Sequence, residues 1–301
     1  EMPLAAEVTL RTAIDDHPRE EPLYEALLAL YRSDAMRDGP RRAANLVRQI
    51  REQLPNSRIA RFESAKSLIS RGRVEEALPV LLGLSRDHPT DYTSLGYLLA
   101  VLRHLDRSDQ ADAILADRLA GGVADDDLFA IAADHFRATE NRAELEKLIL
   151  SRPASLERTL ALARFYLRED QPARALPLLE EASDERLDDP VPAYSLLGHA
   201  LLELDRLEEA AARMQQAAQA YPDAAADLLF RRAVLFEEAG QRPRSEQAME
   251  QILEKYPNHA ATNNSLGYVW ADQGKNLDRA RELIERALAV KPDQSAYLDS
   301  L

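Results

Sequence analysis

Apolar side chains recur at helical spacing in two neighbouring stretches of residues 191–224. The first stripe consists of Tyr194, Leu197, Gly198 and Leu201, and the second consists of Ala210, Met214 and Ala217. The pattern is interrupted at Asp205–Arg206 and ends at Pro222. It predicts two short amphipathic helices joined by a tight turn.

Small residues predict that these two helices approach each other closely. Gly198 has no β-carbon and Ala210 has only a methyl group, so the two backbones can pack more tightly than larger side chains would allow. A large residue at either position would overpack the contact at a cost of about 1–3 kcal/mol.

The same two-helix pattern recurs along nearly the whole chain. We expect complete units at residues 21–57, 58–91, 92–125, 126–155, 156–189, 191–224, 226–259 and 260–293. Unit 126–155 fits least well, because it is short and carries Leu145 in the small-residue position. Residues 1–19 fit the second helix of a truncated unit and residues 294–301 fit the start of a further one, so we expect more protein on both sides.

The repeated unit resembles the tetratricopeptide repeat (TPR), a family of helical repeats with a period of 34 residues. The resemblance is carried by Tyr194, Leu197-Gly198, Ala210 and Pro222, and again by Leu266-Gly267, Trp270, Ala280 and Pro292. It implies an all-α fold, in which residues 1–301 form a single right-handed superhelical solenoid (an α/α superhelix) of antiparallel helix pairs. Eight complete and two half repeats give eighteen helices, and the resemblance implies a concave groove lined by the first helix of each repeat.

Composition narrows the possible partners. The chain of 301 residues carries a formal net charge of -14, which argues against nucleic acid and does not favour an anionic membrane surface. It contains no cysteine, so disulfides and thiolate metal sites are excluded, and both the cytoplasm and a periplasm-like compartment remain open. No apolar run approaches the 18–20 or so residues that span a bilayer.

No sequence motif for catalysis or cofactor binding is present. The chain lacks a G-x-S-x-G elbow, an H-E-x-x-H pair, a Walker loop and a G-x-G-x-x-G turn. We therefore expect no catalytic residues, no cofactor and no enzyme activity.

The histidines do not predict a metal site. His17, His88 and His259 lie beside or near the prolines that end repeats, where capping of a helix C-terminus explains them. The remaining three, His104, His135 and His199, lie on the first helices of different repeats, and their spacing does not supply the convergence that zinc requires.

Two further features favour structural roles. The acidic run 125–127 lacks the alternating oxygen ligands, central glycine and distal glutamate of a calcium loop, so we expect Asp126 to cap a helix. The aromatic residues at the core position of the repeat are expected to pack rather than to stack on a ligand. They are Tyr24, Phe136, Tyr166, Phe236 and Trp270.

The inner face of each first helix supplies the candidate binding residues that the TPR resemblance implies. They are Lys66, Arg103, Arg137, Arg164, Arg168, His199, Glu203, Glu237, Asn264, Tyr268 and Asp272. Lys and Arg predominate before residue 191 and acids after it, which predicts an extended partner whose acidic part lies toward the N-terminal half. The alternative is that these are ordinary solvated polar faces.

Three functions remain open at this stage. The first is a scaffold or adaptor that binds a protein or extended peptide in its groove, although the Lys/Asn set with which some TPR co-chaperones clamp a terminal carboxylate is not reproduced. The C-terminal repeat resembles those of bacterial TPR proteins, including envelope lipoproteins that act as adaptors, which weakly favours the bacterial envelope over the cytoplasm. The alternatives are the TPR arm of a larger enzyme, such as a glycosyltransferase, and a self-assembly module.

Overall fold

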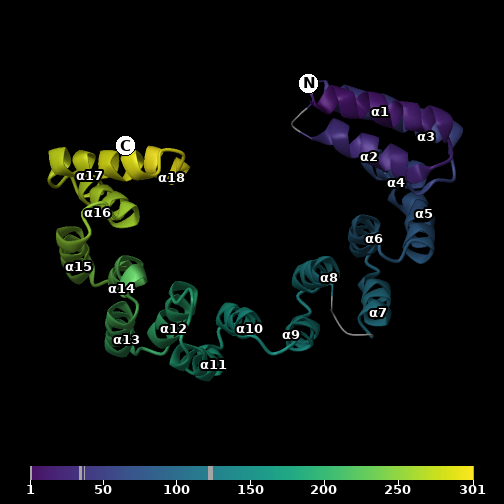
Figure 1. Cartoon of the computed structure of the whole chain (residues 1–301). Coiled ribbons are helices and arrows are strands. Elements are labelled where there is room, and N and C mark those ends of the chain that lie inside the picture. The colour runs from purple at the N-terminus through teal and green to yellow at the C-terminus, as the bar shows by residue number, and fades with distance from the viewer. Residues whose placement is uncertain (1, 34–35, 37, 121–124, 301) are drawn as a thin grey trace. The chain divides into compact units, whose positions relative to one another are not determined.

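The computed structural model describes residues 2–33, 36, 38–120 and 125–300 (Figure 1). These described residues form eighteen α-helices and one short 3₁₀ helix and contain no β-strand. The all-α fold and the number of helices predicted from the apolar pattern are therefore confirmed. Contacts divide the chain into two compact units, Glu1–Ser151 (unit 1) and Arg152–Leu301 (unit 2).

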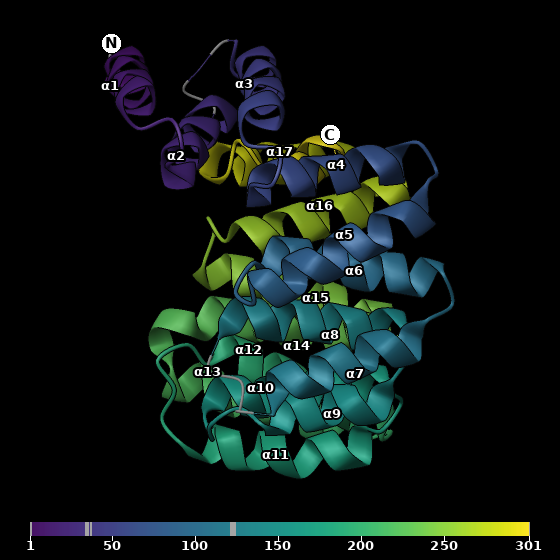
Figure 2. The same cartoon turned by 90° about the vertical axis from the view of Figure 1, so that its right-hand side faces the viewer.

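Unit 1 begins with a single helix and continues with four helix pairs. Its helices are α1 (Met2–Asp16), α2 (Glu21–Arg32), α3 (Gly39–Gln53), α4 (Arg58–Ser70), α5 (Val74–Asp87), α6 (Tyr92–His104), α7 (Ser108–Leu119), α8 (Asp126–Ala138) and α9 (Arg142–Leu150). In Figure 2 the successive helices α4, α5 and α6 lie one below another. At nine residues, α9 is the shortest helix of this unit.

Unit 2 contains four complete pairs and a final turn of helix. Its elements are α10 (Leu156–Arg168), α11 (Pro172–Asp184), α12 (Val191–Glu203), α13 (Leu207–Ala220), η1 (Pro222–Ala224), α14 (Ala225–Glu238), α15 (Arg242–Lys255), α16 (Ala260–Asp272), α17 (Leu277–Val290) and α18 (Ser295–Leu298). Each helix lies within one of the expected ranges, except that α14 begins at Ala225, one residue early. The division of the chain into these repeats stays a prediction. That all residues form one right-handed superhelix stays a prediction.

A left-handed backbone residue closes the turn inside seven of the pairs. These residues, with φ between 53° and 74°, are Gly72, Asp106, Glu140, Asp170, Asp205, Gly240 and Gly274. The N–H of the following residue donates to the carbonyl five positions earlier, at 2.7–2.9 Å, in each of these turns. This is the Schellman arrangement, which ends a helix and reverses the chain. Its recurrence shows that the repeat is a backbone unit as well as a sequence pattern.

Small and large residues alternate in the core as the sequence predicts. The small positions Ala77, Ala111, Ala175, Ala210, Ser245 and Ala280 are all buried, and so is Leu145 in their place in α9. The aromatic core positions Tyr24, Phe136, Tyr166, Phe236 and Trp270 are also buried. Packing rather than ligand stacking is therefore confirmed for these five rings.

Two predicted helix caps were wrong in detail. The N-cap of α8 is Asp125 rather than Asp126, since its carboxylate accepts from the N–H groups of Asp127 (2.9 Å) and Leu128 (3.2 Å). His259 caps the N-terminus of α16 rather than the C-terminus of the preceding helix. In both cases the side chain one position before the helix reaches the unpaired amides of its first turn.

Candidate protein-binding faces

The first helices of the pairs form one side of each unit. In unit 1, α6 contacts α8, and in unit 2, α10 contacts α12 and α12 contacts α14. The second helices instead contact the first helix of their own pair and, apart from α7, the first helix of the next pair in the same unit. Figure 1 shows the result for unit 2, where α10, α12 and α14 lie along the inner side of the curve and α11, α13 and α15 along the outer side.

All eleven candidate residues lie on first helices, three in unit 1 and eight in unit 2. Asn264 on α16 and the unit 1 residues Lys66 and Arg103 are partly buried. The other eight, Arg137, Arg164, Arg168, His199, Glu203, Glu237, Tyr268 and Asp272, are exposed. A role for any of them in binding stays a prediction.

The three candidate cations of unit 1 all have partners within the chain. Lys66 pairs with Glu63 (3.2 Å), and Arg137 pairs with Asp134 on its own helix (2.6 Å). Arg103 donates a hydrogen bond to a ring nitrogen of His135 at 3.2 Å. The positive charge that the sequence predicts on this face is therefore largely compensated by neighbouring carboxylates.

The charged candidate residues of unit 2 have fewer ion-pair partners, and the sign of their charge changes along the unit. Arg164 and Arg168, one turn apart on α10, form no ion pair with any residue in the described ranges. Glu203 on α12 pairs with His199 (3.1 Å). Farther along, the described structure gives no ion pair to Glu237 on α14 or Asp272 on α16. Among the candidate residues, cations thus occupy the first repeat of this unit and anions the later ones.

The helix that carries Tyr268 is held firmly at its C-terminal end. Glu246 on α15 accepts from Lys275 Nζ (2.6 Å), Gln273 Nε2 (3.1 Å) and the indole Nε1 of Trp270 (3.3 Å). The hydrogen bond from Lys275 is the main reason why the pKa of Glu246 lies below its usual value. These bonds fix α16, on which the residue Tyr268 is 54% exposed.

An aromatic pair on the same side of unit 1 was missed by the sequence analysis. The rings of Phe62 on α4 and Tyr97 on α6 meet edge to face with centroids 5.2 Å apart. Tyr97 is 38% exposed, and Lys66 lies 5.6 Å from the centre of the Phe62 ring. The only sequence signal was an aromatic residue outside the core stripe of each helix.

One set of hydrogen bonds has the connectivity of a nucleophilic triad. Asp227 Oδ1 lies 3.1 Å from His259 Nε2, and His259 Nδ1 lies 2.7 Å from Thr262 Oγ1. Thr262 is completely buried, so a substrate cannot reach its hydroxyl. The arrangement therefore serves to cap α16.

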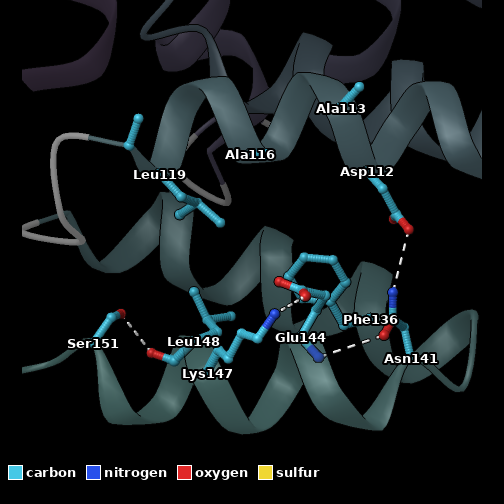
Figure 3. A pocket seen from close by; sticks show the side chains of 11 residues that line it. Asp112, Ala113, Ala116, Leu119, Phe136, Asn141, Glu144, Lys147, Leu148 and Ser151 are labelled. Atoms are coloured by element: carbon cyan, nitrogen blue, oxygen red, sulfur yellow. Dashed lines mark hydrogen bonds and ion pairs between the residues drawn. The ribbon is translucent and has the colours of Figure 1, made fainter.

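A cleft of about 610 Å³ lies between the second helices α7 and α9 (Figure 3). Its apolar lining comes from Ala113, Ala116, Leu119, Ala120, Phe136 and Leu148. Because α9 ends after nine residues, the later part of α7 has less helix beside it. The cleft is a consequence of the short repeat that the sequence identified as the weakest.

The described part of the chain contains no group of three or more His, Asp or Glu side chains placed to hold a metal ion. Within the same residues, no helix is both long and apolar enough to cross a bilayer.

Comparison with known proteins identifies the repeats. Residues 160–225 and 230–297 match the family described as "Tetratricopeptide repeat", and residues 4–120 match "Bacterial transcriptional activator domain". A curated relative, the TPR repeat-containing protein PA4667 of Pseudomonas aeruginosa, is 31% identical over 149 residues, which are 50% of this chain. The chain spans about a quarter of that relative's length (24%).

Solved structures give distant similarities. A tetratricopeptide repeat protein from Parabacteroides merdae shares 14% identity at a TM-score of 0.43, covering 81% of this chain and 97% of the other. A MamA structure shares 20% identity at a TM-score of 0.37, covering 54% and 96%. The family match and the helix pairs together show that this chain contains tetratricopeptide repeats, which the family model places at residues 160–225 and 230–297.

Proposed function

We propose that this chain is a non-catalytic scaffold that binds a protein or an extended peptide along the first-helix faces of its repeats. TPR proteins are in general protein-interaction modules, and helix pairs stacked side by side present long concave surfaces. The observation that carries the proposal is the order of the charges on the first-helix face of unit 2.

Arg164 and Arg168 are exposed one helical turn apart, so both side chains project from the same face of α10. A partner carboxylate that approaches this face meets two cations that no described carboxylate of the chain neutralises. Such a local positive potential in a molecule of net charge -14 steers an acidic segment.

The first helices α14 and α16, later in unit 2, carry negative charge instead. Glu237 and Asp272 carry exposed carboxylates, and Tyr268 adds an exposed ring on α16. Carboxylates and an aromatic face together suit a lysine or arginine side chain. A partner with an acidic part and a basic part can then bind unit 2 in only one direction. In unit 1, the first-helix residues Lys66, Arg103 and Arg137 are proposed to contact a partner of the same class.

The test is the association rate of a partner that has first been isolated with the wild-type chain. Arg164→Glu combined with Arg168→Glu is expected to slow association at low salt, with a difference that shrinks as ionic strength rises. The matched control is Arg242→Glu combined with Lys291→Glu, which makes the same charge change on exposed residues at the ends of second helices. Equal rates for the two double variants at every salt concentration would refute the proposed face.

A further inference from the structure

A buried histidine connects three helices of unit 1. His135 on α8 is 1% exposed. Its Nδ1 atom lies 3.2 Å from Arg103 Nη1 on α6, and its Nε2 atom lies 2.7 Å from Asp112 Oδ1 on α7. The second oxygen of Asp112 accepts from Asn141 Nδ2 at 3.2 Å, as Figure 3 shows.

These contacts determine where the ring proton lies. A guanidinium group can only donate hydrogen bonds, so Nδ1 of His135 must accept from Arg103 and carries no proton. In the neutral ring the proton is then on Nε2, from which it is donated to the carboxylate of Asp112. The structure therefore shows one defined tautomer in which both ring nitrogens are used.

Protonation of the His135 ring would change only one of its two hydrogen bonds. The N–H on Nε2 keeps its bond to Asp112, and the pair becomes an ion pair. At Nδ1, however, a new N–H would face the Arg103 guanidinium, so two donors and two positive charges would stand at a distance of 3.2 Å. Arg103 has to leave the ring, and its partly exposed position on α6 gives it a route to solvent.

We propose that His135 is a proton-controlled positioning residue for Arg103: protonation of its Nδ1 atom releases the Arg103 guanidinium from the ring toward the first-helix face of unit 1. Charged side chains close to His135 in the sequence pair with one another and do not take the place of the ring as a partner of Arg103. On α8 itself, Asp134 and Arg137 pair with each other. On α9, Glu144 pairs with Lys147.

The consequence for binding rests on the proposed function. A released Arg103 adds a cation to the face that is proposed to receive an acidic segment, so acidification strengthens such binding. By linkage, an acidic ligand that holds Arg103 favours the protonated ring to the same extent.

The experiment needs no ligand, so its result is independent of whether the proposed binding exists. The wild-type chain, labelled with ¹⁵N in arginine and histidine, is titrated from pH 8 downward and followed by NMR. We expect His135 to show the Nε2–H tautomer at high pH. We also expect the side-chain N–H signals of Arg103 to shift or broaden with the same midpoint at which the His135 ring takes up its proton.

Variants separate this coupling from a general effect of pH. His135→Gln, whose amide oxygen can accept from Arg103 and whose amide nitrogen can donate to Asp112 without taking up a proton, is expected to leave the Arg103 signals unchanged until the chain unfolds. His104→Gln, one residue from Arg103 and exposed, is the control and should leave the coupling unchanged. The proposal is overturned if the side-chain N–H signals of Arg103 do not change over the pH range in which His135 takes up its proton. It is equally overturned if the ring stays neutral until the wild-type chain unfolds.

Discussion

Gly267 is the position where one added methyl group has the clearest predicted effect. A β-carbon at this residue of α16 would lie 2.7 Å from the backbone carbonyl oxygen of Ala280 and 2.8 Å from Cγ1 of Ile284. A carbonyl inside α17 cannot move alone, so the helix itself must shift. We expect a cost near the upper end of the 1–3 kcal/mol range for overpacking. Helix propensity favours alanine by about 1 kcal/mol, which leaves a net loss of about 2 kcal/mol for Gly267→Ala.

Two other glycines provide controls of the same chemistry. At Gly198 an added β-carbon would meet the ends of flexible side chains, Met214 Cε at 2.7 Å and Leu235 Cδ1 at 2.9 Å, so we expect Gly198→Ala to stay within about 1 kcal/mol of wild type. At Gly96 nothing lies within 4 Å, and Gly96→Ala should gain about 0.5–1 kcal/mol.

The assay for unit 2 is urea denaturation followed by tryptophan fluorescence. Trp270, the single tryptophan of the chain, is buried three residues from Gly267. The Gly96 variant in unit 1 is followed by hydrogen exchange of the amides of α6, which reports local stability. A Gly267→Ala chain that is as stable as wild type, or a Gly96→Ala chain that is less stable, would refute the packing argument.

Two further predictions concern the turns and the N-terminal helix. Glu140 holds a left-handed backbone (φ 53°), so Glu140→Gly should stabilise unit 1 by roughly 1 kcal/mol in urea denaturation, and a decrease would contradict this reasoning. The buried carboxylate of Glu7 accepts from Tyr31 Oη (2.6 Å), and this bond is the main cause of a pKa below the usual value for glutamate. Its stabilising effect should therefore be complete above about pH 4.3 and should disappear as the pH falls through the lowered pKa. A Glu7→Gln chain whose urea midpoint keeps the wild-type pH dependence between pH 6 and 2 would show that this carboxylate does not contribute.

The apolar pattern was sufficient for the fold because each repeat buries its side chains against its neighbours. The burial of Tyr24, Phe236 and Trp270 follows from helical spacing alone. Identical short segments were a less reliable guide to how a residue packs. The tetrapeptide Ser-Leu-Gly-Tyr occurs at 94–97 and at 265–268, yet only the second glycine meets another backbone, because it lies three positions later in its helix.

The candidate faces could be predicted only in part. Spacing placed the eleven residues on first helices, and the carboxylates three positions before Lys66 and Arg137 were a signal of ion pairs that the sequence analysis did not use. The bond between Arg103 and His135 joins residues 32 positions apart, and it depends on how neighbouring repeats pack rather than on either helix alone. The role of His259 was mistaken for a similar reason, since a cap depends on where the next helix begins.

The direction in which a partner lies along unit 2 tests the proposed function most directly. A photo-crosslinking amino acid can be placed at Tyr268 on α16 and, in a second variant, at Glu157 in the first turn of α10, and the attached partner residues can be identified by mass spectrometry. Both positions are exposed on first helices. We predict that the α10 position captures the acidic part of the partner and the α16 position its basic part. Capture of the same partner segment at both positions, or capture in the reverse order, would contradict the account.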